Sequence, residues 1–304
     1  MEKIIKVKNL YKSYGKIQAV QGLDFYVETG KLFAFLGPNG AGKSTTIDMI
    51  CTLLQADSGS ITVAQWEVGT HDQQIRQMIG AVFQEGVLDN LLTVEENLQT
   101  RGSFYGLHGK ELHQAVQKTA NLTGVTELLK RPYGKLSGGQ KRRCDIARAL
   151  IHTPKILFLD EPTTGLDPQT RQAVWETIQD IQKQNQMTIF MTTHYMEEAA
   201  RADYVVIIDE GHITAKGTPA ELKEHYSKDK LILATKNVNA VAAVLQQFQL
   251  TYHQIADTFE VNIQSTLDAV PVITACLTEL ESFEVIKGTM DDVFIMITGK
   301  EMRS

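Results

Sequence analysis

The chain has 304 residues, of which 43% are hydrophobic and 22% are charged, and its formal net charge is −6. This length suits two domains better than one, and the composition excludes a largely disordered or collagen-like chain. The negative charge argues against nucleic acid as the main partner, because binding to phosphate backbones depends on clustered Lys and Arg. Cys51, Cys144 and Cys276 lack metal-ligand spacing, so we expect buried thiols in a reducing cytoplasm, with neither a disulfide nor a metal cluster.

Apolar runs in the chain are short. The longest, such as YVVIID (204–209) and VFIMIT (293–298), have the length of strands and fall well below the ~18–20 residues of a membrane-spanning helix. The first ten residues are charged throughout and lack the apolar core of a signal peptide. We therefore expect a chain that neither crosses a membrane nor is exported by the usual route.

The first two thirds of the chain read as strands and helices of one unit. Apolar and polar residues alternate in IIKVKNL (4–10) and IQAVQGLDFYV (17–27), which predicts half-buried antiparallel strands. A buried strand at 31–37 precedes a helix at 44–54, and helical patterns occupy roughly 90–150. Further buried strands follow at 155–160, 187–193 and 204–209. This alternation predicts a parallel sheet with helices on its faces, closed by a turn at 210–219.

The last third has a different order of elements. Its pattern reads strand, helix, two short strands, helix and strand, which resembles the small ferredoxin-like unit. Pro271 marks a first turn or a kink in the second helix. We therefore predict two domains, at 1–220 and 221–304, the second being α+β and acidic.

A phosphate-binding loop is the strongest motif. GPNGAGKST (37–45) matches G-x-x-x-x-G-K-[ST] between a predicted strand and a predicted helix. Its glycines let backbone N–H groups point at phosphate oxygens, Lys43 can reach the β- and γ-phosphates, and the Ser44 hydroxyl can bind Mg²⁺. The predicted nucleotide-binding residues of this loop are Gly37, Pro38, Asn39, Gly40, Ala41, Gly42, Lys43, Ser44 and Thr45.

Two carboxylates end the strand ILFLDEP (156–162). Carboxyl ends of parallel strands line the crevice where α/β sheets bind ligands. We therefore predict that Asp160 holds Mg²⁺ and that Glu161 orients or deprotonates the attacking water.

A second turn suited to anions lies in LSGGQKRRCDIARAL (136–150). Ser137 precedes a predicted helix and could be merely its N-cap. A Ser-Gly-Gly turn at a helix start can also bind an anion through its hydroxyl and N–H groups. The chain thus has two candidate phosphate-binding turns and one phosphate loop.

Taken together, LSGGQ between GPNGAGKST and ILFLDEP resembles the signature of ATP-binding-cassette (ABC) ATPases, over residues 1–220. Gln84 in AVFQE resembles the Q-loop glutamine, GLD (165–167) with Asp167 resembles the D-loop, and His194 in TTHYMEEA resembles the switch histidine. Tyr14 in YKSYG resembles the aromatic residue that stacks on adenine.

The resemblance implies a fold, a mechanism and partners. The fold would combine a parallel-sheet core, an antiparallel β subdomain and a helical signature subdomain. Two cassettes, identical or homologous, would pair head to tail, with each ATP between one phosphate loop and the other chain's signature turn. Catalysis would use Glu161, His194 and Gln84, and Gln84 would also contact Mg²⁺. The signature residues are Ser137, Gly138, Gly139 and Gln140, to which Asp167 of the D-loop is added.

The class of ABC ATPase follows from what surrounds these motifs. There is no coiled-coil insertion between Lys43 and Asp160 and only one cassette, so the chain is expected to dock beneath a separate permease at the cytoplasmic side of the cell membrane. The segments at 192–219 and 290–299 are similar to ATPase subunits of daunorubicin-type drug exporters. Export of sodium, lipid or polysaccharide, or a regulatory or assembly ATPase without transport, are the alternatives.

Overall fold

The computed structural model describes residues 2–299. The chain divides into two compact units, with the boundary between Lys216 and Gly217, and each unit is described by itself. None of the helices in the described range is long and apolar enough to cross a membrane.

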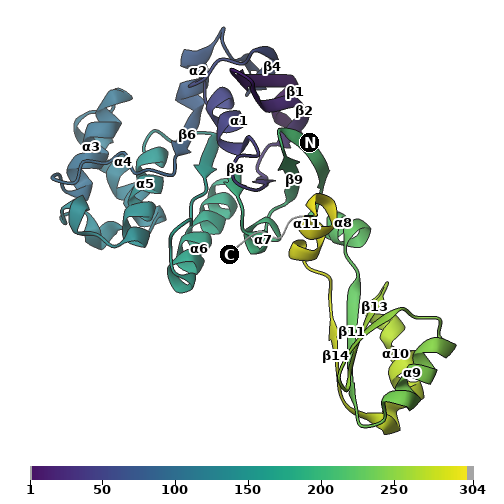
Figure 1. Cartoon of the computed structure of the whole chain (residues 1–304). Coiled ribbons are helices and arrows are strands. Elements are labelled where there is room, and N and C mark those ends of the chain that lie inside the picture. Colours follow the sequence, from purple (N-terminus) through teal and green to yellow (C-terminus); the bar gives the residue numbers. More distant parts are fainter. Residues whose placement is uncertain (1, 300–304) are drawn as a thin grey trace. The chain divides into compact units, whose positions relative to one another are not determined.

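Two sheets form the body of the first unit (Figure 1). The antiparallel sheet, in the order β2-β1-β4-β5, consists of β1 (Lys3–Tyr14), β2 (Ile17–Glu28), β4 (Ser58–Val63) and β5 (Trp66–Glu67). The central sheet, in the order β10-β9-β3-β8-β7-β6, consists of β3 (Leu32–Leu36), β6 (Ile79–Val82), β7 (Ile156–Asp160), β8 (Thr188–Thr193), β9 (Tyr204–Asp209) and β10 (His212–Gly217).

Parallel pairing in the central sheet positions the site. β3 pairs in parallel with β8 and β9, and β7 pairs in parallel with β6 and β8. The phosphate loop, Glu161 and His194 directly follow β3, β7 and β8, and Gln84 follows β6 after one residue. These predicted site residues therefore lie at the carboxyl ends of the parallel strands. The sequence prediction of a parallel sheet is confirmed.

The segment predicted as a turn at 210–219 is partly wrong. Only Glu210 and Gly211 form the turn, with φ of 49° and 80°, and β10 then continues the chain as an edge strand. Two successive residues with positive φ are typical of tight hairpin turns. The strand was not predicted because its sequence, HITAKG, has few apolar residues.

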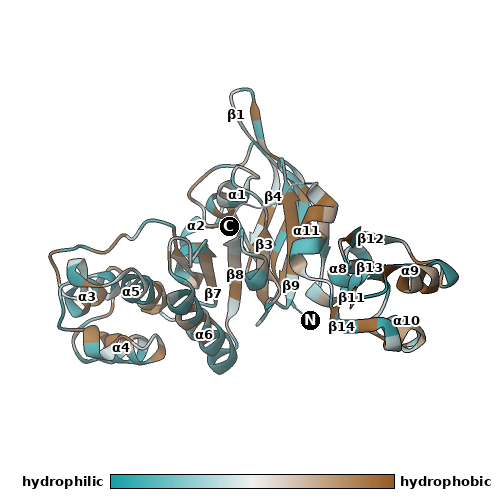
Figure 2. Cartoon of the chain, turned by 60° about the horizontal axis from the view of Figure 1, so that its bottom comes forward, coloured by the Kyte–Doolittle hydropathy of each residue, from teal (hydrophilic) through white to brown (hydrophobic). Residues whose placement is uncertain are grey.

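Helices of the first unit fall into two groups. α1 (Lys43–Ile50), α2 (Asp72–Met78), α6 (Pro168–Asn185) and α7 (Met196–Ala199) accompany the sheets. Figure 2 shows α6 largely hydrophilic in colour beside strands that are largely hydrophobic; it buries Val174, Trp175, Ile178 and Ile181 at helical spacing. α3 (Val94–Phe104), α4 (Gly109–Leu122) and α5 (Gly138–Leu150) form a separate helical group with a hydrophobic core of its own.

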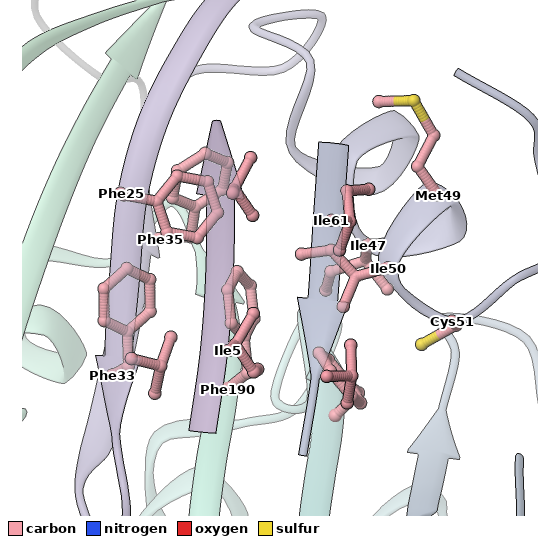
Figure 3. Close-up of a cluster of buried hydrophobic side chains, with 14 of the residues drawn as sticks. Ile5, Phe25, Phe33, Phe35, Ile47, Met49, Ile50, Cys51, Ile61 and Phe190 are labelled. Carbon is pink, nitrogen blue, oxygen red and sulfur yellow. The ribbon is translucent and has the colours of Figure 1, made fainter. Parts of the chain in front are cut away.

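The main core lies between the two sheets and α1 (Figure 3). Phe33 on β3 stands 5.6 Å from Phe25 on β2 and 4.9 Å from Phe190 on β8, measured between ring centroids. Burial of such aromatic rings dominates the stability of a core. The contacts fix the antiparallel sheet on the parallel sheet and support the loop between β3 and α1.

The second unit contains the predicted βαββαβ order, with α8 before it and α11 after it. It consists of α8 (Pro219–Tyr226), β11 (Asp229–Thr235), α9 (Val238–Gln247), β12 (Tyr252–Ile255), β13 (Thr258–Ile263), α10 (Ala269–Cys276), β14 (Leu280–Ile286) and α11 (Met290–Thr298). Its antiparallel sheet has the order β12-β13-β11-β14. Pro271 lies in the first turn of α10, where it is tolerated.

The run at 293–298, which has the length of a strand, belongs to the helix α11 instead. Thr289 and Asp292 form a capping box at its start, and Met290, Val293 and Phe294 are buried on one face. This spacing of three and four residues is that of a helix packed on one side, and α11 packs against α8.

Candidate functional site

The phosphate loop makes a tight passage from β3 to α1. Gly42 has φ of 100°, and a Cβ there would collide with the Ala19 carbonyl of β2, so only glycine fits this position. Asn39 and Gly40 are exposed at the tip. The loop therefore holds its backbone in the shape that exposes N–H groups, next to the N-terminus of α1.

Lys43 is almost fully buried, with 4% of its surface exposed. Its Nζ donates to the carbonyls of Gly37 at 2.8 Å and Pro38 at 3.1 Å, and it lies 3.1 Å from Glu161 Oε1. The ammonium group is thus fully coordinated by protein oxygens, and the phosphate groups of a nucleotide can replace them.

Glu161 has an unusual backbone and a crowded carboxylate. Its φ is 45°, a left-handed conformation uncommon for a residue other than glycine. Gln84 Nε2 lies 3.0 Å, His194 Nδ1 3.1 Å and Thr164 Oγ1 3.2 Å from Glu161 Oε2. The structure therefore brings the three predicted catalytic residues Glu161, Gln84 and His194 together.

Burial alone would raise the pKa of Glu161. The hydrogen bond with His194 and the charge of Lys43 outweigh burial and hold its pKa at about 2. The carboxylate is therefore ionised at neutral pH, which is the state that can accept a proton from water.

Asp160 lies at the end of β7 beside two hydroxyl groups. Ser44 Oγ donates to its Oδ1 at 3.4 Å, and Thr192 Oγ1 donates to the same oxygen. A hydroxyl and a carboxylate side by side are the hard oxygen donors that Mg²⁺ prefers. Within residues 2–299 no group of three or more His, Cys, Asp or Glu could hold a metal by protein ligands alone. The donor set fits an ion shared with nucleotide phosphates.

The Ser137–Gln140 turn is the N-cap of α5. Ser137 Oγ accepts from the Gln140 N–H at 3.4 Å, and Gln140 Oε1 accepts from the Ser137 N–H at 3.1 Å, which makes a capping box. Ser137 and Gly138 are exposed. Among the hydrogen bonds of the described residues, none joins this turn to the phosphate loop of the same chain. The turn faces outward, as a contact with another molecule requires.

Two other predicted residues, Asp167 and Tyr14, make no contact with the carboxylates of Asp160 and Glu161 among the contacts described above. Asp167 is the N-cap of α6, and its Oδ1 accepts from the Thr170 N–H at 3.0 Å. Tyr14 ends β1 with 49% of its surface exposed, and the Lys12 ammonium lies 5.9 Å from its ring centroid. A half-exposed ring can offer a face to a planar base.

Sequence reasoning missed three buried residues around this site. The Thr192 hydroxyl accepts from the Glu161 N–H at 3.0 Å, Glu198 accepts from the hydroxyls of Thr163 and Thr193, and Arg142 donates to four backbone carbonyls. A charged residue in line with the apolar face of the predicted helix after Ser137 was the signal that could have found Arg142. No helix was predicted around Glu198.

A phosphate loop after β3, an acid pair at the end of β7 and a separate helical group define a P-loop nucleotide hydrolase. Residues 20–164 match the family described as ABC transporter, and residues 217–298 match the C-terminal domain of DrrA1-3-like ATP-binding proteins. The chain belongs to the ABC transporter ATP-binding family. It is a nucleotide-binding ATPase cassette, and cassettes of this family work as dimers with a membrane permease.

Similarity to three named proteins extends over nearly the whole chain. The linearmycin resistance ATP-binding protein of Bacillus subtilis is 36% identical, over 99% of this chain and 100% of that protein. The daunorubicin/doxorubicin resistance ATP-binding protein of Streptomyces peucetius is 33% identical, over 97% and 92% of the two chains. The Nod factor export ATP-binding protein I of Ralstonia nicotianae is 33% identical, over 99% and 95%.

Solved structures of cassettes resemble the first unit. CbiO1 of Clostridium perfringens, part of an ABC transporter complex, is 30% identical with a TM-score of 0.69, covering 73% of this chain and 91% of that one. A dimeric cassette in a post-hydrolysis state, bound to ADP and Pi, is 26% identical with a TM-score of 0.64, covering 70% and 98%. The predicted ABC fold with a small C-terminal domain is confirmed.

Proposed function

We propose that this chain is the ATPase subunit of an exporter that removes a drug-like, hydrophobic compound through a separate permease. The observation that carries the proposal is similarity over both units to proteins named for resistance to linearmycin and daunorubicin. The second unit supports it further, because residues 217–298 match the C-terminal domain of DrrA1-3-like ATP-binding proteins. Relatives named for Nod factor export favour a lipid or polysaccharide as the second candidate cargo.

Glu161 is proposed as the base that activates the attacking water. Its carboxylate is ionised and touches His194 and Gln84, which can orient the same water and sense the γ-phosphate. When Lys43 turns from Glu161 to the phosphates, the carboxylate loses its buried cation and becomes a better proton acceptor. Binding of ATP would thereby prepare the base for the reaction.

Mg²⁺ is proposed to bind through Ser44 and Asp160, with Gln84 as a further ligand. The ion would neutralise charge that develops on the β- and γ-phosphates. The amide of Gln84 contacts Glu161 in this structure, so the metal role of Gln84 requires a change in its contacts when nucleotide binds.

The ATP site is proposed to be shared by two chains, either two copies or a pair of homologous cassettes. The exposed Ser137–Gln140 turn and the phosphate loop of one chain do not bond to each other, and each suits an anion. Head-to-tail pairing supplies each ATP with one turn from each chain. Tyr14 would stack on adenine, and Asp167 would lie at the interface.

A groove beside the helical group is proposed as the docking site of the permease. It has a volume of about 830 Å³ and is lined by α2, the end of α3, α4 and the segment after α5. Phe104, 74% exposed, lines this groove, and a large aromatic ring can contribute much of the contact energy with a partner. Docking there would hold the chain at the cytoplasmic side of the membrane.

Transport by membrane vesicles tests the proposal. Inside-out vesicles that contain this chain with its permease, sought among multi-span membrane proteins encoded by neighbouring genes, should take up daunorubicin when ATP is added. Glu161→Gln should keep ATP binding and lower ATP turnover by at least ~10²-fold, as expected from loss of a general base. Glu197→Gln removes an exposed carboxylate and is the control.

Two outcomes separate the parts of the proposal. Near-normal turnover in Glu161→Gln would refute the role of Glu161. Rapid ATP hydrolysis without uptake of daunorubicin, in vesicles that do take up a lipid-linked saccharide, would refute the drug-like cargo and leave the ATPase assignment in place.

A further inference from the structure

Arg142 on α5 is buried, with 8% of its surface exposed, and all its polar contacts are to backbone carbonyls. Its Nε donates to Pro162 at 2.6 Å, and its Nη1 donates to Phe83 at 2.5 Å. Its Nη2 donates to Asp160 at 3.1 Å and to Glu161 at 2.8 Å. One rigid guanidinium fork thus gathers the ends of two strands.

The carbonyls that Arg142 binds belong to the segments that carry the candidate catalytic groups. Phe83 immediately precedes Gln84, and Asp160 and Glu161 are the two carboxylates at the end of β7. The side chains of Gln84 and Glu161 meet, with Gln84 Nε2 3.0 Å from Glu161 Oε2. Arg142 therefore restrains the backbone on both sides of that contact, at the residue before Gln84 and at Glu161 itself.

The backbone of Glu161 needs such support. Its φ is 45°. Two hydrogen bonds restrain this conformation: the Glu161 N–H donates to the Thr192 hydroxyl, and Arg142 donates to the Glu161 carbonyl. A residue in a sparsely populated conformation keeps it only while its surroundings enforce it. Removal of the guanidinium leaves buried carbonyls unpaired and frees Glu161 to relax.

We propose that Arg142 is a positioning residue for ATP hydrolysis, which holds Glu161 and Gln84 in register with the signature helix α5. Because Ser137 is the N-cap of the same helix, contact of ATP with this turn is transmitted through Arg142 to the water-activating carboxylate of the same chain. The inference rests on the proposed role of Glu161 in hydrolysis.

A neighbouring arginine provides a matched control. Arg143 follows on the same helix, but it donates to the Gly124 carbonyl at 3.2 Å in an exposed contact within the helical group. Arg143→Met removes the same charge from the same helix without touching β6 or β7. Arg142→Lys keeps the charge and loses the fork, because an ammonium group cannot reproduce the planar set of donors.

The experiment measures ATP turnover per nucleotide-binding site, together with ATP affinity, in the full chain. Arg142→Met should lower kcat by about 10- to 100-fold, since misplacement of a catalytic group by about 1 Å costs that much, while ATP affinity changes by less than about threefold. Arg142→Lys should fall between Arg142→Met and the wild type. Arg143→Met should match the wild type. If Arg142→Met does not fold, the gap between Arg142→Lys and Arg143→Met is the test.

A double-mutant cycle with Glu161→Gln distinguishes positioning from general support of the fold. If Arg142 acts through Glu161, Arg142→Met produces little further loss of the residual turnover of Glu161→Gln. An equal loss in both backgrounds, or an Arg142→Met turnover equal to that of Arg143→Met, would overturn the inference. Near-normal turnover in Glu161→Gln alone would instead refute the proposed base.

Discussion

Glu161 is a buried carboxylate whose ionisation depends on its charged neighbours. Its pKa is lowered from 4.5 to about 2, because contacts with His194 and Lys43 outweigh the effect of burial. A carboxyl group whose pKa is lowered by folding stabilises the protein fully above its unfolded pKa, and this stabilisation is lost as the pH falls toward the folded pKa. By this linkage Glu161 contributes about 3 kcal/mol at neutral pH.

We therefore predict a pH-dependent difference between the wild type and Glu161→Gln without nucleotide. The wild type should melt at the higher temperature near neutral pH, and the gap should narrow as the pH falls below about 4.5 and close only near pH 2. Calorimetry of the first unit's transition measures it, with Glu197→Gln as the control at an exposed position. A gap of constant size over this range would contradict the ionised, paired state of Glu161.

Sequence patterns predicted the side chains that meet at the site and missed those behind them. Lys43, Ser44, Asp160 and Glu161 follow from local motifs, because each lies at a strand end or helix start. Arg142 and Thr192 act on backbone atoms of segments distant in sequence. Such contacts depend on how α5 and β8 approach β7, which no local pattern encodes.

At the scale of elements, the packing of α5 against α6 depends on Gly139. A Cβ on Gly139 would collide with the Thr170 Cγ2 atom, whereas a Cβ on Gly138 would lie 3.2 Å from the flexible end of Leu166. Gly139→Ala should therefore destabilise the first unit by about 1–3 kcal/mol through overpacking. Gly138→Ala should cost less. Chemical denaturation measures both.

Thr170→Ser provides the decisive check on Gly139→Ala, since it removes the colliding methyl group and keeps the hydroxyl. We expect the double variant to regain most of the stability that Gly139→Ala loses. If Thr170→Ser restores nothing, the packing of the signature turn against α6 does not have the described geometry.

The elements that the sequence predicted best were those with strong periodicity or capping motifs. The buried strands β3, β7 and β8 are short apolar runs, and both helices of the βαββαβ unit were recognised. β10 was missed because an exposed edge strand carries few apolar residues. α11 was not recognised because five consecutive apolar residues fit a strand as well as a helix.

At the scale of the whole molecule, the second unit is proposed to pair or regulate cassettes. No phosphate loop or catalytic pair was found in its sequence, while it has its own sheet and core. Tethering two cassettes raises their effective concentration without new contacts at the ATP site. A chain that ends at Gly217 should therefore keep ATP binding but dimerise more weakly or support less transport. Assembly and transport at wild-type levels would reduce the unit to a structural appendage.

The central claim is that each ATP site is completed by the signature turn of the other chain. Dimers mixed from two differently tagged chains test it most directly. With Lys43→Ala on one chain and Ser137→Arg on the other, one shared site stays intact and ATP turnover should persist. With both substitutions on one chain and none on its partner, both shared sites are damaged and turnover should vanish. Persistence in the second pairing and loss in the first would contradict the account.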